Sequence, residues 1–373
     1  MKLWIALLAC WLWVAPAWAQ LVTTSAKHAA IMDYETGQVL WEKDGRVPMP
    51  PASMSKLMTS YMVFEKLKND ELKLTDKLLV SENAWRKGGS KMFVRVGDTV
   101  PVEDLLKGVI IQSGNDACIV LAEGLSGSEE SFAAAMTRKA KDIGLENSTF
   151  ANATGWPDPN HKMSAVDLVK LARLIVKDHP ESLIYYAQTS FTYNGIKQGN
   201  RNPLLGTFPG ADGLKTGHTE ESGYGLVGTA ERDGQRRIIA FNGTTSMQER
   251  ADEARSLLTQ AFFDFEMVPL FTEGEVVGAA KVLKGKSPEV NLIAPKDLKF
   301  GVHKAARKSL KAEVVYQGPL KPGFKKGDVI AQLVVSAEGR APETFDLVAA
   351  EGVKKAGLFG TIGAGWGRIF GGQ

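Results

Sequence analysis

Apolar runs at both ends of the segment 27–265 predict strands. The run over 27–44 is interrupted by turn residues at 35–37, which predicts a hairpin. Three further strands are expected late in the segment, over 214–218, 224–230 and 237–241. Because strands lie at both ends with helical patterns between them, we expect an α+β domain whose first and last strands share one antiparallel sheet.

Helical spacing of apolar residues predicts the elements between these strands. The proline-rich stretch 48–51 stops regular structure, and a helix is expected to start near Ser53, directly after it. A helical pattern over 102–111 breaks at 112–115 and resumes over 116–125. The remaining expected helices cover 129–143, 164–178 and 248–265.

Short alternating segments separated by turn residues characterise the chain from about residue 268. Clear examples are 275–280, 312–316 and 329–335. This pattern predicts a small all-β domain of the β-sandwich type over 267–350. No group of residues typical of a catalytic or binding site occurs in it.

The first twenty residues have the pattern of a secretory signal peptide. Lys2 precedes an apolar run over 3–14, and an Ala-x-Ala sequence ends at Ala19. We expect cleavage after Ala19, which assigns 1–19 to the signal and predicts export through the inner membrane. The alternative is an uncleaved membrane anchor, for which the apolar run is short.

The final segment, 353–373, predicts an amphipathic helix. Most of its large apolar side chains fall on one helical face, namely Leu358, Phe359, Ile362, Trp366, Ile369 and Phe370. Lys354, Lys355 and Arg368 add positive charge, as in segments that lie in a membrane interface rather than cross it. The alternative is a tail that docks on the protein itself, because its glycines weaken the helix in water.

Charge and residue usage exclude several functions. A net charge of +3 is too small to indicate a nucleic-acid-binding protein. The five histidines are scattered without a His-Glu-x-x-His pattern, and there is no glycine-rich phosphate loop, so neither a metal nor a cofactor is expected. Loss of Cys10 with the signal leaves Cys118 alone, which excludes an internal disulfide. Apolar neighbours favour a place in the core for Cys118.

The first candidate motif is Ser53-Met54-Ser55-Lys56. Residues three apart on a helix share a face, so Lys56 can reach the hydroxyl of Ser53. A serine nucleophile needs a base within hydrogen-bond reach, and a lysine serves only if burial or nearby cations lower its pKa. The alternative for the motif alone is a helix N-cap serine beside a solvated lysine.

The second motif, Ser113-Gly114-Asn115, lies in the break between two helical patterns. A serine hydroxyl can both donate and accept, so Ser113 can pass a proton, and the amide of Asn115 can hold a peptide group or orient a lysine. The alternative is a turn between helices in which Asn115 or Asp116 is the N-cap.

The third motif, Lys215-Thr216-Gly217, lies on an expected strand. A lysine beside a threonine hydroxyl suits a terminal carboxylate, and Gly217 allows a substrate backbone to approach closely. An exposed edge strand could also pair with an extended peptide. The alternative is a surface strand without a functional role.

In this order the three motifs resemble those of the D-alanyl-D-alanine carboxypeptidases among the low-molecular-mass penicillin-binding proteins, the penicillin-binding protein 5 and 6 group. Further family-like stretches are 51–59, 112–117, 152–155, 157–161 and 212–219. Trp156 stands where the family pattern has an aliphatic residue. The resemblance covers nearly the whole chain, and it implies a β-lactamase/transpeptidase-like fold for a serine D,D-peptidase domain over 20–266.

The resemblance also implies the role of each site residue. Ser53 attacks the carbonyl between two D-alanines, Lys56 accepts its proton, and Ser113 passes a proton to the leaving D-alanine. Asn115 holds the substrate and Lys56. Lys215 and Thr216, beside Gly217, are implied to bind the terminal carboxylate of the substrate. The backbone N–H groups of Ser53 and His218 are implied to form the oxyanion hole. Arg201 and Arg250 are implied to support the carboxylate or Lys215.

The implied substrate is the peptidoglycan stem pentapeptide, which would lose its terminal D-alanine in cell-wall biogenesis and shape control. β-Lactams would acylate Ser53, and the enzyme would work at the periplasmic face of the inner membrane as a peripheral protein. A serine β-lactamase is the nearest alternative, but no match to its deacylating glutamate is found. A non-catalytic cell-wall scaffold is the other alternative, although a pure binder needs neither Ser53 nor Lys56.

Overall fold

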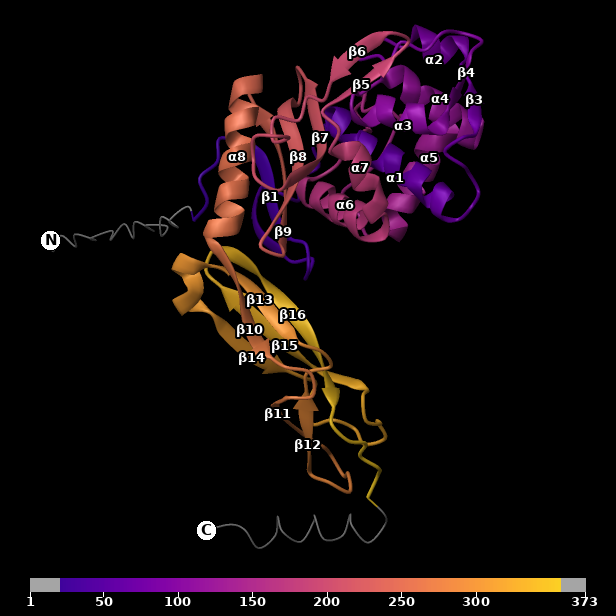
Figure 1. The fold of residues 1–373 in the computed structure, drawn as a ribbon. Helices are drawn as coiled ribbons and strands as arrows, with labels where there is room; N and C mark the ends of the chain where they lie inside the picture. Colours follow the sequence, from indigo (N-terminus) through magenta and orange to yellow (C-terminus); the bar gives the residue numbers. More distant parts are fainter. Residues whose placement is uncertain (1–20, 357–373) are drawn as a thin grey trace, which may run out of the picture.

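The computed structural model describes residues 21–356 of the 373-residue chain. Figure 1 shows two bodies joined end to end, a larger body of helices and strands and an elongated β domain. The expected signal peptide 1–19 lies outside the described residues, as does the tail 353–373 beyond Ala356. No helix within residues 21–356 has both the length and the apolar character needed to cross a membrane.

A five-stranded antiparallel sheet in the order β2-β1-β9-β8-β7 forms the centre of the larger body. Its strands are β1 (His28–Asp33), β2 (Val39–Lys43), β7 (Ala211–Thr219), β8 (Gly223–Arg232) and β9 (Gln235–Thr244). Ile31 of β1 lies opposite Ile239 of β9, which confirms that the first and last strands share one sheet. β7 lies at one edge of this sheet.

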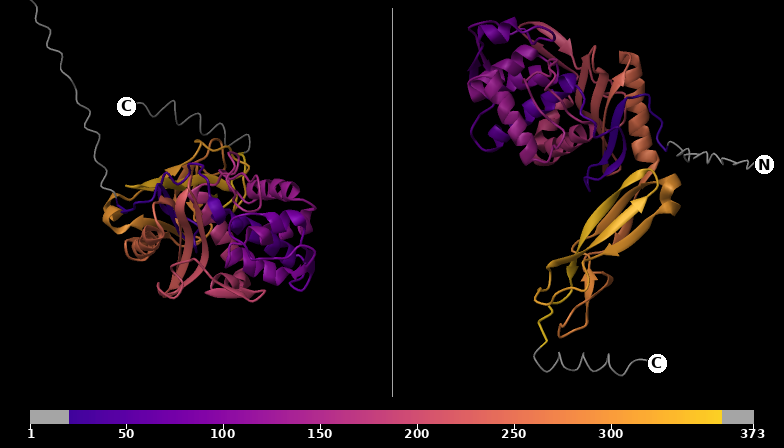
Figure 2. Two further views of the ribbon diagram at one scale, coloured as in Figure 1. Left: turned by 90° about the horizontal axis from the view of Figure 1, so that it is seen from above. Right: turned by 180° about the vertical axis from the view of Figure 1, so that it is seen from behind.

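Alternation of side chains along the strands gives the sheet two apolar faces. Ala30 and Met32 of β1 pack into the helical cluster, whereas Ala29 and Ile31 face α8 (Met247–Phe263). Figure 2 shows α8 on one side of the sheet and the remaining helices on the other. Burial on both faces explains why these strands are apolar almost throughout.

The helical part contains seven helices, α1 (Lys56–Lys68), α2 (Glu82–Arg86), α3 (Val102–Ile110), α4 (Asn115–Ser126), α5 (Glu129–Asp142), α6 (Ala165–Asp178) and α7 (Leu183–Tyr186), among the described residues. The expected helices over 102–111, 129–143 and 164–178 are confirmed. Ser128 and Ser164 cap α5 and α6 by accepting from a backbone N–H three residues on. Two small two-stranded sheets were not predicted, β3 (Lys77–Leu79) with β4 (Thr99–Pro101) and β5 (Ser190–Tyr193) with β6 (Ile196–Gly199).

The second body is all-β, as expected. Its strands are β10 (Phe265–Phe271), β11 (Val276–Lys281), β12 (Glu289–Ile293), β13 (Leu298–His303), β14 (Lys311–Val315), β15 (Val329–Ala337) and β16 (Arg340–Ala349). β10 pairs with β13, and the other strands form a sheet in the order β11-β12-β16-β15-β14. The expected boundary at 266 falls inside β10, and Val353 is buried in the core of this domain.

Gln38 joins the two bodies. Its side-chain amide donates to the carbonyl of Lys299 at 2.7 Å and accepts from the backbone N–H of Gly301 at 2.9 Å. Arg340 adds a third contact to the oxygen of Gln38, at 3.1 Å, and its guanidinium lies 4.0 Å from the ring centroid of Phe300. Hydrogen bonds in both directions from one buried amide fix the β domain against the hairpin of β1 and β2.

Candidate active site

Ser53 lies in a short 3-10 turn at the start of α1. The sequence predicts an α-helix from about Ser53, whereas the structure has a 3-10 turn over Ala52–Ser55 and an α-helix from Lys56. Side chains three apart are eclipsed in a 3-10 turn, and the Nζ of Lys56 lies 3.0 Å from the Oγ of Ser53. Ser53 is half-buried, while Lys56 is 1% exposed. The hydroxyl can therefore meet a ligand while the amine stays out of water.

Two further acceptors hold the Nζ of Lys56. The side-chain oxygen of Asn115 lies at 2.8 Å and the carbonyl oxygen of Thr154 at 2.5 Å. Burial is the main cause that lowers the pKa of Lys56 to about 8, and the cationic Arg201 and Lys87 act in the same direction. This amine can exchange a proton with the adjacent hydroxyl near neutral pH.

The second motif fills the gap between α3 and α4, as expected. Ser113 is buried, with its backbone in the left-handed region at φ +58°. Asn115 is the first residue of α4, and Gly114 is the N-cap, so neither Asn115 nor Asp116 has the capping role weighed above. The carboxylate of Asp116 accepts from the backbone N–H groups of Met92, Phe93 and Val94 and holds that loop beside the site. The side chain of Asn115 is left to contact Lys56.

The third motif lies on the edge strand β7. The Nζ of Lys215 donates to the Oγ of Ser113 at 3.0 Å and to the carbonyl of Thr216 at 3.2 Å. Burial holds the pKa of Lys215 well below its ordinary value, and the positive charge of Lys56 and Arg201 adds to this effect. The structure thus brings all three motifs into one site.

Gly217 allows β7 to pass close to the serine turn. A Cβ atom at this position would lie 2.9 Å from the carbonyl oxygen of Pro51 and 3.0 Å from the Cγ of Met54. Both residues flank Ser53 in sequence. Any larger residue would therefore push the edge strand away from Ser53.

Arg201, Arg250 and His218 lie at the side of the site near β8. The guanidinium of Arg201 donates to the Oγ of Ser90 at 2.8 Å, and that of Arg250 contacts the carbonyl of Arg201 at 3.4 Å. His218 is exposed, and its ring stacks on Tyr224 with the centroids 3.8 Å apart. Within residues 21–356, the Nε of buried Arg250 has no hydrogen-bond partner. The cations give this side of the site a positive potential that suits a carboxylate.

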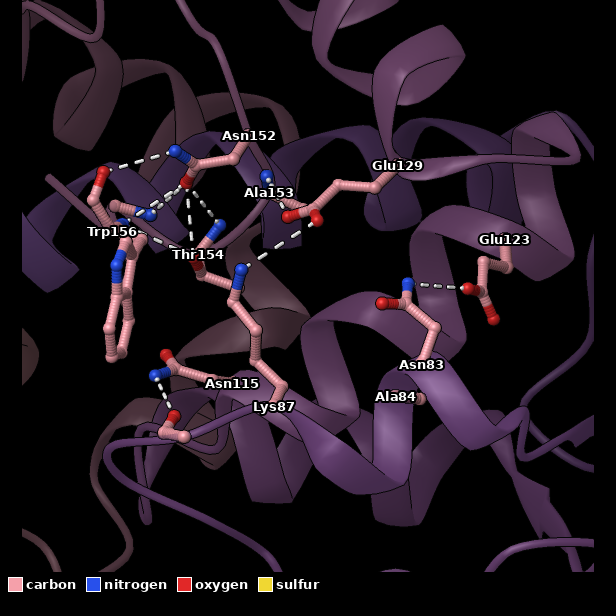
Figure 3. A network of polar contacts seen from close by, with 12 residues as sticks. Asn83, Ala84, Lys87, Asn115, Glu123, Glu129, Asn152, Ala153, Thr154 and Trp156 are labelled. Atoms are coloured by element: carbon pink, nitrogen blue, oxygen red, sulfur yellow. Dashed lines mark hydrogen bonds and ion pairs between the residues drawn. The ribbon is translucent and has the colours of Figure 1, made fainter. Parts of the chain in front are cut away.

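A tight loop over 152–156 presents the Thr154 carbonyl to Lys56. Figure 3 shows the side chain of Asn152 within this loop. The side-chain oxygen of Asn152 accepts from the backbone N–H groups of Thr154, Gly155 and Trp156 at 2.8 to 3.1 Å, and its amide donates back to the carbonyl of Trp156 at 3.0 Å. Because the contact to Lys56 comes from backbone, sequence reasoning did not assign it. The asparagine followed three residues later by a glycine is the signal that could have found it.

Trp156 lies at the surface at the end of this loop. Its side chain is 44% exposed, and the Nζ of Lys87 lies 5.4 Å from the ring centroid. Lys87 also lies 3.9 Å from the carboxylate of Glu129, which accepts from the backbone N–H of Ala153 (Figure 3). The aromatic residue that departs from the family pattern thus packs at the surface rather than in the core.

Cys118 is buried on α4, and burial raises the pKa of its thiol to about 12. The thiol is therefore protonated and unreactive at neutral pH. Within the described part of the chain, no group of three or more His, Cys, Asp or Glu side chains could hold a metal ion.

Comparison with known families and proteins gives concordant matches. The family model described as D-alanyl-D-alanine carboxypeptidase matches residues 15–244, and that of the penicillin-binding protein 5 C-terminal domain matches 265–355. The chain is 38% identical to the D-alanyl-D-alanine carboxypeptidase DacC of Escherichia coli K12 over 348 residues, which are 91% of this chain and 87% of that protein.

Solved structures agree with these matches. Penicillin-binding protein 5 from Haemophilus influenzae superposes with a TM-score of 0.76 at 33% identity, over 89% of this chain and 98% of that one. Penicillin-binding protein D2 from Listeria monocytogenes, solved in an ampicillin-bound form, superposes with a TM-score of 0.60 at 33% identity, over 65% of this chain and 98% of that one. These matches confirm the fold class of both bodies.

Proposed function

The chain belongs to the D-alanyl-D-alanine carboxypeptidase family, a family of serine peptidases, and on that basis we propose how its residues perform the reaction. Ser53 is the nucleophile and Lys56 is its base. The 3.0 Å contact between their side chains, together with the lowered pKa of Lys56, supports this pair. The substrate is a peptidoglycan stem pentapeptide that ends in D-alanyl-D-alanine.

Acylation starts with the transfer of the Ser53 proton to Lys56 as Oγ attacks the carbonyl carbon between the two D-alanines. Negative charge develops on the carbonyl oxygen, and the backbone N–H groups of Ser53 and His218 stabilise it. The C–N bond then breaks. The leaving nitrogen takes a proton through Ser113, whose hydroxyl is within hydrogen-bond distance of Lys215.

The terminal carboxylate of the substrate binds among the cations of the site. Lys215 and Thr216 contact it directly, while Arg201 and Arg250 support it from the β8 side. The unpartnered Nε of Arg250 in the described chain supports this role. β7 is an edge strand, so the peptide backbone can add to its free side.

Water completes the cycle by hydrolysing the ester on Ser53, which releases the shortened peptide and restores the hydroxyl. Asn115 holds Lys56 in place for this second proton transfer. β-Lactams acylate the same serine because their strained amide occupies the position of the scissile bond. The ampicillin-bound Listeria relative supports that expectation.

The cellular site of action follows from the two ends of the chain. Segment 1–19 directs export and is removed, and the tail attaches the enzyme to the periplasmic face of the inner membrane. Val353 is buried in the β domain, so a truncation that tests the tail should end at Ala356. The truncated protein is expected to keep its turnover of soluble peptides and to leave the membrane fraction at high salt, which screens contacts between charged side chains and lipid headgroups. Its retention on membranes at high salt would exclude anchoring by the tail.

The contact between Lys56 and Ser53 is the observation that carries the proposal, and D-alanine release from a pentapeptide tests it. Ser53→Ala should abolish release and labelling by a fluorescent penicillin, whereas Ser256→Ala on exposed α8 should have no effect. Release by Ser53→Ala would refute the assignment. If the wild type hydrolysed penicillin rapidly and left the pentapeptide intact, it would be a β-lactamase. A folded wild type that neither releases D-alanine nor is labelled would be a scaffold.

A further inference from the structure

Three loops of the β domain, 283–287, 320–326 and 351–356, lie at the end of this domain that is opposite the catalytic body (Figure 1). They contain seven lysines, Lys284, Lys286, Lys321, Lys325, Lys326, Lys354 and Lys355. All seven side chains are exposed, and the only acidic residue in these loops is Glu351. The whole chain has a net charge of +3, so without these loops it would have a net charge of −3. We call this surface the basic tip.

Backbone hydrogen bonds join the three loops into one surface. The N–H of Lys286 donates to the carbonyl of Lys354 at 3.0 Å, and that of Leu283 donates to Leu320 at 2.8 Å. The N–H of Gly323 donates to the carbonyl of Val353 at 2.7 Å. The lysines are therefore held side by side by the fold, although they are far apart in sequence.

The charge of the basic tip is not neutralised within the described part of the chain. None of the seven lysines lies within 4.0 Å of a carboxylate there. At the other end of the domain, Arg307 pairs with Glu266, and Arg340 pairs with Glu343. Concentrated charge of one sign repels itself, and an anionic surface relieves that repulsion on contact.

Two features of the basic tip favour a lipid surface over a discrete ligand. The side chain of Leu283 is 49% exposed among the lysines, which suits shallow contact with acyl chains. Lys286 and Lys354 line an open hollow of about 300 Å³ together with Glu351, so its lining has a net charge of +1 and can admit a headgroup phosphate. In addition, the backbone N–H of Ala356 donates to the carbonyl of Lys284 at 3.0 Å, so the start of segment 353–373, which is expected to lie in a membrane interface, is held on this surface.

We propose that the basic tip binds the anionic headgroups of a membrane surface and so orients the β domain on it. This contact goes beyond anchoring by the tail, because five of the seven lysines lie in loops 283–287 and 320–326. Each lysine that reaches an anionic bilayer strengthens binding about fivefold. The contribution weakens as salt screens it.

The test uses the full mature chain and sedimentation with vesicles of phosphatidylcholine, alone or with about 30 mol % phosphatidylglycerol. The test variant carries Lys284→Gln, Lys286→Gln, Lys321→Gln, Lys325→Gln and Lys326→Gln. The matched control carries Lys296→Gln, Lys299→Gln, Lys304→Gln, Lys308→Gln and Lys311→Gln, five exposed lysines toward the catalytic end of the domain. Thermal unfolding checks that both variants are folded.

The test variant should bind the phosphatidylglycerol vesicles at least 20-fold more weakly than the wild type, with unchanged binding to phosphatidylcholine. The control should bind like the wild type. Equal binding by the test variant would overturn the inference. If neither variant folds, the salt dependence of vesicle binding by the wild type tests the inference. Its extra affinity for vesicles with phosphatidylglycerol should fall at least tenfold between about 0.05 and 0.3 M salt. Salt-independent binding would also overturn it.

A separate variant distinguishes a failure of anchoring by the tail from a failure of membrane binding by the basic tip. A variant with Phe359→Ser, Ile362→Ser and Trp366→Ser tests the tail and leaves the basic tip unchanged. If this variant loses its affinity for phosphatidylcholine and keeps a salt-sensitive preference for phosphatidylglycerol, both contacts exist. If it binds both vesicles like the wild type, tail anchoring is wrong, and the basic tip is judged by the lysine variant alone.

Discussion

A Cβ atom on Gly155 would lie 1.9 Å from the carbonyl oxygen of Ala52, the residue before Ser53. The loop that supplies the Thr154 carbonyl thus touches the serine turn directly. Gly155 also has φ +77°, a conformation that side chains disfavour. The two halves of the site can approach this closely only because position 155 has no side chain.

Gly155→Ala should therefore destabilise the protein by about 3 kcal/mol, from backbone strain together with overpacking. Gly195 is a matched control, because it has φ +74° and no atom within 4 Å of an added Cβ. Gly195→Ala should cost about 1 kcal/mol from backbone strain alone. Urea denaturation measures both, and equal losses would show that the contact with Ala52 is unimportant.

The pKa of Lys56 predicts the pH dependence of the reaction. A lysine that acts as a base must be neutral, so kcat/KM should rise with pH and level off above an apparent pKa of about 8. Lys87→Gln removes a cation that helps to lower this pKa, so its profile should move to higher pH. The profiles are measured from D-alanine release. A flat profile between about pH 6 and 9 would remove Lys56 from the role of base.

Asn152 is predicted to act through the loop that it holds. Asn152→Ala frees the N–H groups of Thr154, Gly155 and Trp156, so the Thr154 carbonyl should move away from Lys56 and kcat should fall by about tenfold or more. Loss of this acceptor destabilises the protonated amine, so the rise of the pH profile should move to lower pH. Asn83→Ala, which breaks a contact with Glu123 only, should behave like the wild type (Figure 3). An unshifted pH profile in Asn152→Ala would leave Asn152 with a purely structural role.

The buried ion pair of Asp33 and Arg237 predicts a loss of stability without a loss of chemistry. Both side chains are nearly inaccessible, and Arg237 also donates to the carbonyl of Ala261 in α8. Asp33→Ala leaves the guanidinium buried and unpaired, which should cost about 3 kcal/mol in the free energy of unfolding. Asp252→Ala breaks an exposed pair with Arg255 and should cost less than about 0.5 kcal/mol. The urea concentration at the midpoint of unfolding measures both losses, and an unchanged midpoint for Asp33→Ala would contradict the prediction. The kcat of both variants should stay at the wild-type value.

Most of the fold could be predicted from the sequence because long helices and strands have a clear hydrophobic periodicity. The hairpin over 27–44, the helices capped by Ser128 and Ser164, and the strands near the third motif all agree with the structure. The short elements α2, α7, β3 and β4 were missed, since three to five residues are too few for a period to be recognised.

The site was predictable only in part, for a related reason. Ser53, Lys56, Ser113 and Lys215 belong to local motifs, so their meeting could be expected from the family pattern. The Thr154 carbonyl belongs to the backbone and has no residue type of its own. The contact of Lys87 with Trp156 joins segments 69 residues apart, which no local pattern relates. The catalytic roles themselves stay predictions until the variants are measured.

The Gln38 joint has a consequence for where the enzyme can work. Because the side-chain amide of Gln38 both donates to β13 and accepts from it, the β domain is fixed relative to the catalytic body rather than flexibly linked to it. If the basic tip contacts the bilayer, the β domain fixes the distance between Ser53 and the bilayer surface. Only peptidoglycan peptides at that distance from the bilayer would then lose their terminal D-alanine. The length of the domain formed by β10 to β16 would therefore determine how far from the membrane the enzyme acts.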